Sequence, residues 1–259
     1  MSKKRGQATL FMILLVILVL AVGFGMFFDK EKLMGIETGT EKVLTTEDRN
    51  VQTFVQTCLE LTAKNGLFYL GYVGGKLTPD PFPAYHSIDS TYKVPYFYLE
   101  EKNVIPIPYK EQYWTELLDR YIYNYFSQCI DDFSGFPIKI EAGQLSSSTK
   151  FAQKSVIFTI NYPVKVTRED FQTANLPELY TATIPLRLRE ILQVSSTIVD
   201  REVKNDRYIH WDYLTQVTNR NYNITAHTEN NQTIIYRIID LENEIDDEPY
   251  ILQFANGVR

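Results

Sequence analysis

A long uncharged run opens the chain, and amphipathic patterns follow it. Residues 10–28 contain apolar side chains and glycine and carry no charge. At roughly 1.5 Å per helical residue, about 19 residues span a hydrocarbon core of about 30 Å. The run therefore predicts a transmembrane helix, so that 1–28 forms a membrane anchor with a short tip ahead of it.

Helical spacing of apolar residues recurs after the anchor. Thr45 and Asp48 have the spacing of a helix-capping pair, and Asn65 with Gly66 is expected to interrupt the helix that follows. The predicted helices cover about 47–64, 110–130 and 188–205, with a short one at 211–218. Prolines exclude a long helix over 77–110, where VPYFYL and VIPIPY suggest an irregular hairpin.

Other segments alternate between apolar and polar positions, which is typical of strands. The predicted strands cover 136–140, a long strand at 156–166, 180–188 and a meander of 221–227, 232–240 and 249–255. Pro163 within the long strand is expected to mark an edge or a bulge. Helices and strands come in separate runs, which favours an α+β domain with an antiparallel sheet over 46–259, joined to the anchor by a linker at 29–45.

Flanking charges orient the anchor. Residues 3–5 are Lys-Lys-Arg, whereas the charges of 29–32 sum to zero. The positive-inside bias then places the N-terminus in the cytoplasm and the rest of the chain outside. A cleaved secretory signal is the alternative, but its apolar core is usually shorter and ends in small residues, whereas this run ends in Met26, Phe27 and Phe28.

Net charge narrows the range of partners. Of 26 basic residues, three precede the anchor, so the remaining chain has 23 basic against 32 acidic residues, a net charge of −9. Phosphate contact needs a basic face, and we therefore expect no nucleic-acid partner. Membrane lipid around residues 10–28 is the expected partner of the anchor.

The two cysteines, Cys58 and Cys129, lie on the apolar faces of two predicted helices. An exterior compartment permits a disulfide between them. A pair of buried free thiols is the alternative. A metal site is not expected, because neither a CxxC motif nor clustered histidine accompanies the pair.

The sequence also contains candidate sites for glycosylation and for the binding of a partner at the surface. Asn223-Ile-Thr225 and Asn231-Gln-Thr233 are N-glycosylation triplets in turn-rich sequence. The aromatic residues of the proline-rich segment form a candidate surface for a protein or glycan partner: Tyr92, Tyr96, Phe97 and Tyr98. The alternative is that these rings attach an irregular segment to the core.

No motif predicts catalysis. Ser147-Ser-Thr-Lys150 fits S-x-x-K, but it lies in a predicted loop, and the SDN and KTG motifs that accompany this chemistry are missing. The three histidines are scattered, and the acidic pairs Asp131-Asp132 and Asp246-Asp247 lack calcium-loop spacing. We expect neither an enzyme nor a bound metal or cofactor.

The N-terminus has a recognisable junction. Lys-Arg-Gly-Gln at 4–7, directly before the apolar run, resembles an archaeal prepilin-type, class III signal. The resemblance implies cleavage between Gly6 and Gln7, with the helix retained on the mature chain. The family usually carries Glu at the fifth mature position, where this chain has Phe11.

Three further segments resemble an uncharacterised family of single-span archaeal surface proteins. They are CLELTAKNGLFYLGYVGG at 58–75, YIYNYFSQCIDDF at 121–133 and EPYILQF at 248–254. This resemblance implies topology and no chemistry. The sequence predicts a single-pass cell-membrane protein with an exterior domain and a structural or interaction role. A prepilin-like filament subunit or pseudopilin is the first alternative, and an envelope hydrolase with an unrecognised site is the second.

Overall fold

The chain divides into two units, Met1–Val43 and Leu44–Arg259. A computed structural model describes residues 45–77, 85–87, 93–99, 110–168, 172–204, 209–229 and 232–257, all within the second unit. The predicted span at 10–28 and the Gly6–Gln7 junction lie outside these residues. Within the described ranges, no helix is both long enough and apolar enough to cross a membrane.

Helix α2, Thr46–Tyr72, is the first described element and the longest helix among the described residues. Its start is the predicted capping pair, since Asp48 N–H donates to Thr45 Oγ1 at 3.3 Å and Thr45 N–H donates to Asp48 Oδ2 at 2.9 Å. The predicted interruption at Asn65 and Gly66 is wrong, because the helix continues through both. Gly66 serves packing instead, as an added Cβ would lie 2.8 Å from the Tyr121 ring.

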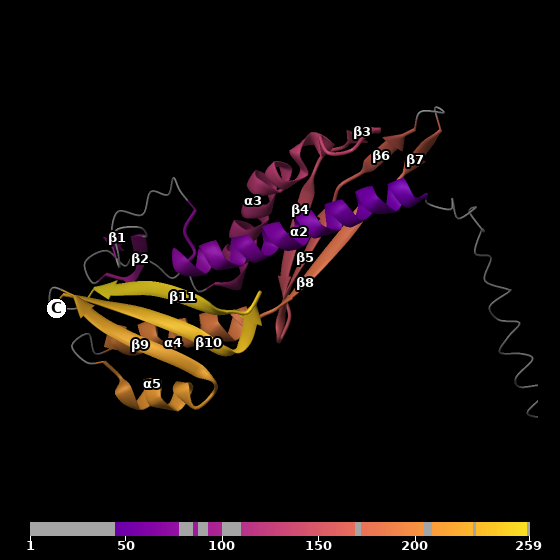
Figure 1. Cartoon of the computed structure of the whole chain (residues 1–259). Coiled ribbons are helices and arrows are strands. Elements are labelled where there is room, and N and C mark those ends of the chain that lie inside the picture. The colour runs from indigo at the N-terminus through magenta and orange to yellow at the C-terminus, as the bar shows by residue number, and fades with distance from the viewer. Residues whose placement is uncertain are drawn as a thin grey trace, which may run out of the picture. The chain divides into compact units, whose positions relative to one another are not determined.

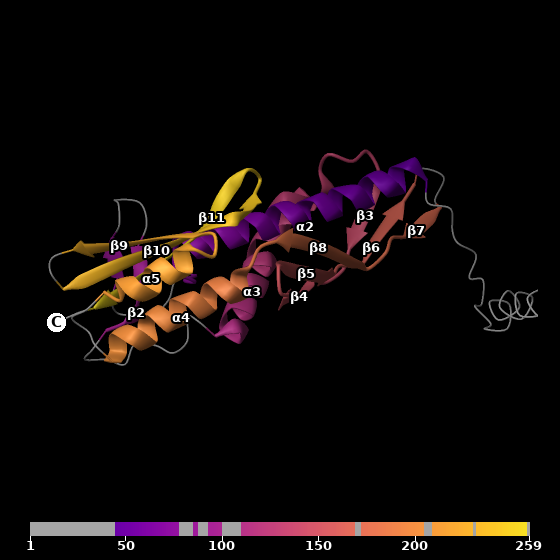
Figure 2. The ribbon, with the colours of Figure 1, turned by 90° about the horizontal axis from the view of Figure 1, so that it is seen from below.

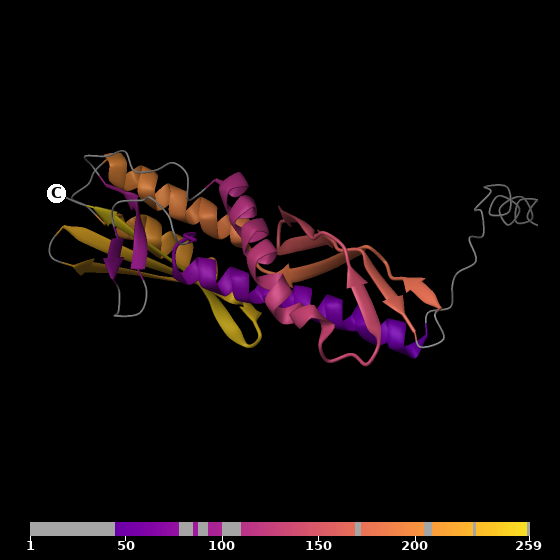
Figure 3. The same cartoon turned by 90° about the horizontal axis from the view of Figure 1, so that it is seen from above.

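Helices α2 and α3, Glu111–Ile130, cross obliquely (Figure 3) and pack on the sheet of order β4-β5-β8. The strands are Ser146–Phe151, Ser155–Asn161 and Leu179–Pro185. Their buried residues alternate along the chain and include Val156, Phe158 and Ile160 of β5 and Tyr180, Ala182 and Ile184 of β8. One face of the sheet therefore belongs to the core beneath the two helices.

A second small sheet has the order β3-β6-β7, formed by Lys139–Ala142, Val164–Thr167 and Thr173–Asn175. The predicted single strand at 156–166 is wrong. It divides into β5 and β6, which belong to different sheets. Pro163 lies at the division, and because proline has no N–H to donate to a ladder, it suits the corner between the two strands.

The C-terminal segments form the predicted antiparallel meander. It consists of β9, Tyr222–Glu229, β10, Thr233–Ile245, and β11, Glu248–Gly257. Two strands from the proline-rich segment, β1, Tyr85–Ser87, and β2, Lys93–Tyr98, extend the sheet to the order β1-β2-β11-β10-β9. Strand β2 pairs with β11 in parallel, and VIPIPY, its expected partner, lies outside the described residues.

Helix α4, Leu188–Lys204, contacts β10 and β2 of this sheet, and α5, Trp211–Thr218, contacts β9 (Figures 1 and 2). The C-terminal end of α2 approaches β11 so closely that glycine is required. Gly74 has φ +60°, and an added Cβ would lie 2.5 Å from the carbonyl oxygen of Gln253. The predicted α+β class with antiparallel-rich sheets is confirmed.

Candidate functional site

A disulfide joins the two crossing helices. Cys58 of α2 and Cys129 of α3 are bonded, with their Cα atoms 5.6 Å apart and a sequence separation of 71. Cys58 is buried, at 1% exposure. The predicted pairing is confirmed, and the alternative of two free thiols is wrong.

Three tyrosines cluster where α2 and α3 meet. Tyr121 lies between Tyr69 and Tyr125, with ring centroids 5.9 Å from the first and 4.4 Å from the second. Tyr125 is 40% exposed, and Tyr69 and Tyr121 are half-buried. Burial, followed by the proximity of the other two phenols, raises the pKa of Tyr121. This tyrosine cluster presents aromatic rings with polar tips on a rigid base.

The aromatic residues of β2 lie mostly against the core. Phe97 is fully buried and stacks on Phe254, with ring centroids 4.5 Å apart. The Tyr96 hydroxyl is 2.9 Å from the Thr233 hydroxyl, and Tyr96 and Tyr98 are half-buried. The proposal of an exposed recognition surface is therefore wrong for Phe97. Tyr92 lies outside the described residues.

The predicted modification sites are placed in part. Asn223 is exposed at the start of β9, and Thr225 is exposed on the same strand. Asn231 lies outside the described residues, as do Gly6 and Gln7 of the predicted processing site.

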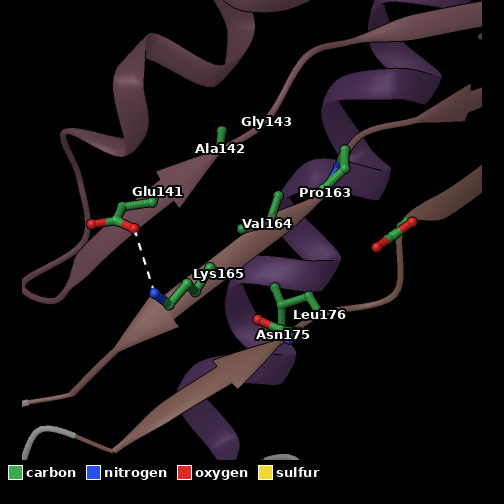
Figure 4. Close-up of a pocket in the computed structure, with 9 residues that line it drawn as sticks. Glu141, Ala142, Gly143, Pro163, Val164, Lys165, Asn175 and Leu176 are labelled. Carbon is green, nitrogen blue, oxygen red and sulfur yellow. Dashed lines mark ion pairs between the residues drawn. The ribbon is translucent and has the colours of Figure 1, made fainter.

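A shallow pocket of about 290 Å³ lies where the two small sheets meet (Figure 4). Pro163, Gly143 and Leu176 line its apolar part, and Lys165 forms an ion pair with Glu141 at 3.7 Å. Lys139 also pairs with Glu141, at 2.7 Å, and this hydrogen bond lowers the pKa of the carboxyl group. All three charged side chains face solvent, so the pocket has no desolvated group of the kind that catalysis uses.

A buried ion pair joins the start of α4 to β10. Arg187 is 5% exposed and pairs with the fully buried Asp240 and, at 2.7 Å, with Glu242. Its guanidinium group lies 4.3 Å from the ring centroid of Tyr222. Burial raises the pKa of Tyr222, and the Arg187 charge opposes that rise. Because Arg187 also donates to the carbonyl oxygen of Arg220 at 3.3 Å, its donors are used in holding the fold.

A second buried carboxyl group lies further along α4. Glu202 is 1% exposed and accepts hydrogen bonds from the Tyr236 hydroxyl and the Asn256 amide. Burial raises the pKa of Glu202, and the two hydrogen bonds oppose this rise. These two hydrogen bonds connect Glu202 of α4 to Tyr236 of β10 and Asn256 of β11.

Side chains of the S-x-x-K match and of each of the two acidic pairs have structural partners. Ser147 and Thr149 of the S-x-x-K match lie in β4, so the predicted loop is wrong, and both hydroxyls donate to oxygens of Asp119 on α3. Asp131 accepts from the Ser134 hydroxyl, and Asp246 pairs with Lys64 at 2.5 Å. Among the residues whose positions are described, no group of three His, Cys, Asp or Glu side chains could hold a metal ion.

Comparison with known proteins yields no relative. No family model, curated protein or solved structure matches this chain. The tyrosine cluster and the disulfide between α2 and α3 are therefore the features from which a role can be argued.

The sequence analysis did not identify the buried carboxyl groups of Asp240 and Glu202, although the apolar pattern around each residue indicates its burial. Asp240 follows Ile234, Tyr236 and Ile238 at every second position, so it lies on the core face of β10. Glu202 continues the helical spacing of Ser195, Ile198 and Val199. A charged residue in phase with an apolar face indicates a buried charge with a partner.

Proposed function

We propose that this chain is a membrane-anchored cell-surface protein whose exterior α+β domain has a structural or interaction role. Residues 10–28 would hold it in the lipid, with the N-terminus in the cytoplasm. The observation that carries the proposal is the disulfide between α2 and α3. Disulfides persist in oxidising environments and are rare where thiols are kept reduced.

The character of the polar groups supports a binding or structural role. Arg187 and Glu202, the most deeply buried charged residues of α4 and its start, have their partners within the fold. Groups whose partners all lie within the fold leave no charge directed at a substrate.

The tyrosine cluster is the surface that we assign to partner contact. Tyr69, Tyr121 and Tyr125 project from two helices that a disulfide joins, so their positions are fixed before a partner arrives. Tyrosine is enriched at interfaces because a rigid ring supplies contact area while its hydroxyl stays hydrated.

A direct experiment separates the anchored protein from a secreted one. Native protein should fractionate with membranes, resist carbonate extraction and lose its exterior domain when intact cells are treated with protease. N-terminal sequencing should give Gln7, if the signal is processed, or the unprocessed terminus. A mature start near Asp29 in the soluble exterior fraction would contradict the anchor.

Filament assembly, the alternative function, is tested on the same material. A prepilin-like subunit would be recovered in sheared filaments that electron microscopy can see. A surface protein of the kind we propose would stay with the membrane fraction after shearing.

A further inference from the structure

We propose that Asn223 carries an N-linked glycan that covers the outer face of β9 and β10. This inference rests on the exterior location proposed above. It identifies a modification site on the folded domain, and three features of the strand support it.

The first feature is the chemistry of the triplet. Asn223-Ile-Thr225 supplies an acceptor amide and the hydroxyl residue that the transfer requires two positions later. In the transfer, Nδ2 of Asn223 forms a bond to C1 of an oligosaccharide held by a lipid-phosphate donor. The bond from C1 to the phosphate oxygen breaks, the lipid phosphate leaves, and one amide proton passes to solvent.

The second feature is the direction of the side chains. Alternate residues of a strand point to opposite faces. Tyr222 is fully buried, and Ile224 and Ala226 pack against the core. Asn223 and Thr225 therefore share the opposite face, and both are exposed. A glycan on Asn223 projects into solvent without disturbing the contacts that hold β9.

The third feature is the surface around the acceptor. Ile239 of β10 is the cross-strand partner of Asn223. Leu241, two residues further along β10, is 58% exposed, and its N–H donates to the carbonyl oxygen of Asn221 at 2.9 Å. An exposed leucine beside the acceptor is apolar surface that a glycan can cover, and covering such surface limits non-specific association.

The test uses the native full-length protein and four variants made in its own host. Peptide mass spectrometry should find a saccharide mass on the peptide that contains Asn223. Asn223→Gln and Thr225→Ala should each abolish that mass, while Thr225→Ser keeps the triplet and should retain it. Asn231→Gln removes the other triplet and should leave the Asn223 glycopeptide unchanged.

Two further measurements separate a failure of the glycan proposal from a failure of folding or of the proposed exterior location. Thermal melts of the Asn223 and Thr225 variants should match the parent to within a few degrees, because these two side chains are exposed to solvent. Protease treatment of intact cells reports location independently of modification. Unmodified Asn223 in protein that protease can reach overturns the glycan and leaves the surface location intact, whereas inaccessible protein overturns both.

Discussion

The hydroxyl of Tyr236 on β10 donates a hydrogen bond to the carboxyl group of Glu202 on α4. Both residues are almost fully buried, and Asn256 of β11 donates to the second carboxyl oxygen. A helix is thus held to the middle of a sheet by a carboxyl group whose pKa is raised by burial. The first prediction concerns that raised pKa.

Glu202 should make the free energy of unfolding fall as the pH rises above 4.5. Its pKa in the folded state lies above the ordinary value of 4.5, so the folded chain holds the proton more tightly than the unfolded chain. Stability from this group is fully present below 4.5 and is lost as pH rises through the folded pKa. Glu202→Gln should remove this loss, as urea unfolding across the range would show.

The matched control is Glu244→Gln, which removes one carboxyl group from an exposed position of β10. In this control variant, the free energy of unfolding should still fall as the pH rises, as it does in the parent. If the free energy of unfolding of Glu202→Gln depends on pH as it does in the parent, the pH dependence does not come from Glu202.

The unit Leu44–Arg259 should fold without the residues that precede it. Leu44–Arg259 forms one compact unit, and its helices and sheets share one core. A fragment of 45–259 is expected to be soluble and to unfold in a single cooperative transition, measured by circular dichroism. Aggregates alone, or a broad melt, would show that the preceding residues contribute to folding.

Replacing Arg187 should lower the free energy of unfolding, because it leaves a buried carboxylate without its cationic partner. Arg187→Met leaves Asp240 without its cationic partner, and the expected loss of unfolding free energy is about 3–5 kcal/mol. Lys154→Ala is the control, since Lys154 pairs with Glu242 in the same network from a largely exposed position. The control should lose no more than about 1 kcal/mol. Equal losses in the two variants would rule out burial as the cause.

The disulfide should contribute to the stability of the α+β domain. Replacing Cys58 and Cys129 with alanine is expected to lower the unfolding free energy by roughly 2–4 kcal/mol, since the bridge restricts the unfolded chain. Reduction of the parent with dithiothreitol should cause a similar loss and should not affect the variant. Two alkylatable thiols in native, unreduced protein would mean that the bridge does not form.

Gly74 should tolerate no side chain. Gly74→Ala places a Cβ against the carbonyl oxygen of Gln253 and the ring of Pro95, at a positive φ. The expected loss exceeds about 1–2 kcal/mol, the usual penalty of that backbone region alone. Gly135→Ala is the matched control, because nothing lies within 4 Å of its added Cβ. Thermal melts of the two variants should therefore differ clearly.

Sequence patterns predicted those elements whose apolar residues follow one period. Helix α5 begins and ends at the predicted residues, and the C-terminal meander has the predicted strands, although β10 is longer. The disulfide followed from two apolar helix faces and a compartment argument.

Elements that break the pattern were missed for identifiable reasons. Strand β4 buries Thr149, whose hydroxyl bonds to Asp119, so its inward face is polar and the sequence resembles a loop. The sequence cannot show that Gly66 accommodates the ring of Tyr121, since that contact joins two helices. The tyrosine cluster depends on the same crossing, and periodicity within one helix does not predict it.

Strand β11 lies between β2 and β10, although β2 precedes both in the chain by well over a hundred residues. During synthesis, β2 therefore has no neighbour on that side until residues 248–257 have emerged. A nascent chain interrupted before Glu248 exposes unpaired edges on β2 and β10, which invite association with other chains. The sheet is therefore completed only when residues 248–257 can pair with both neighbours, and until then the partly folded domain is prone to association.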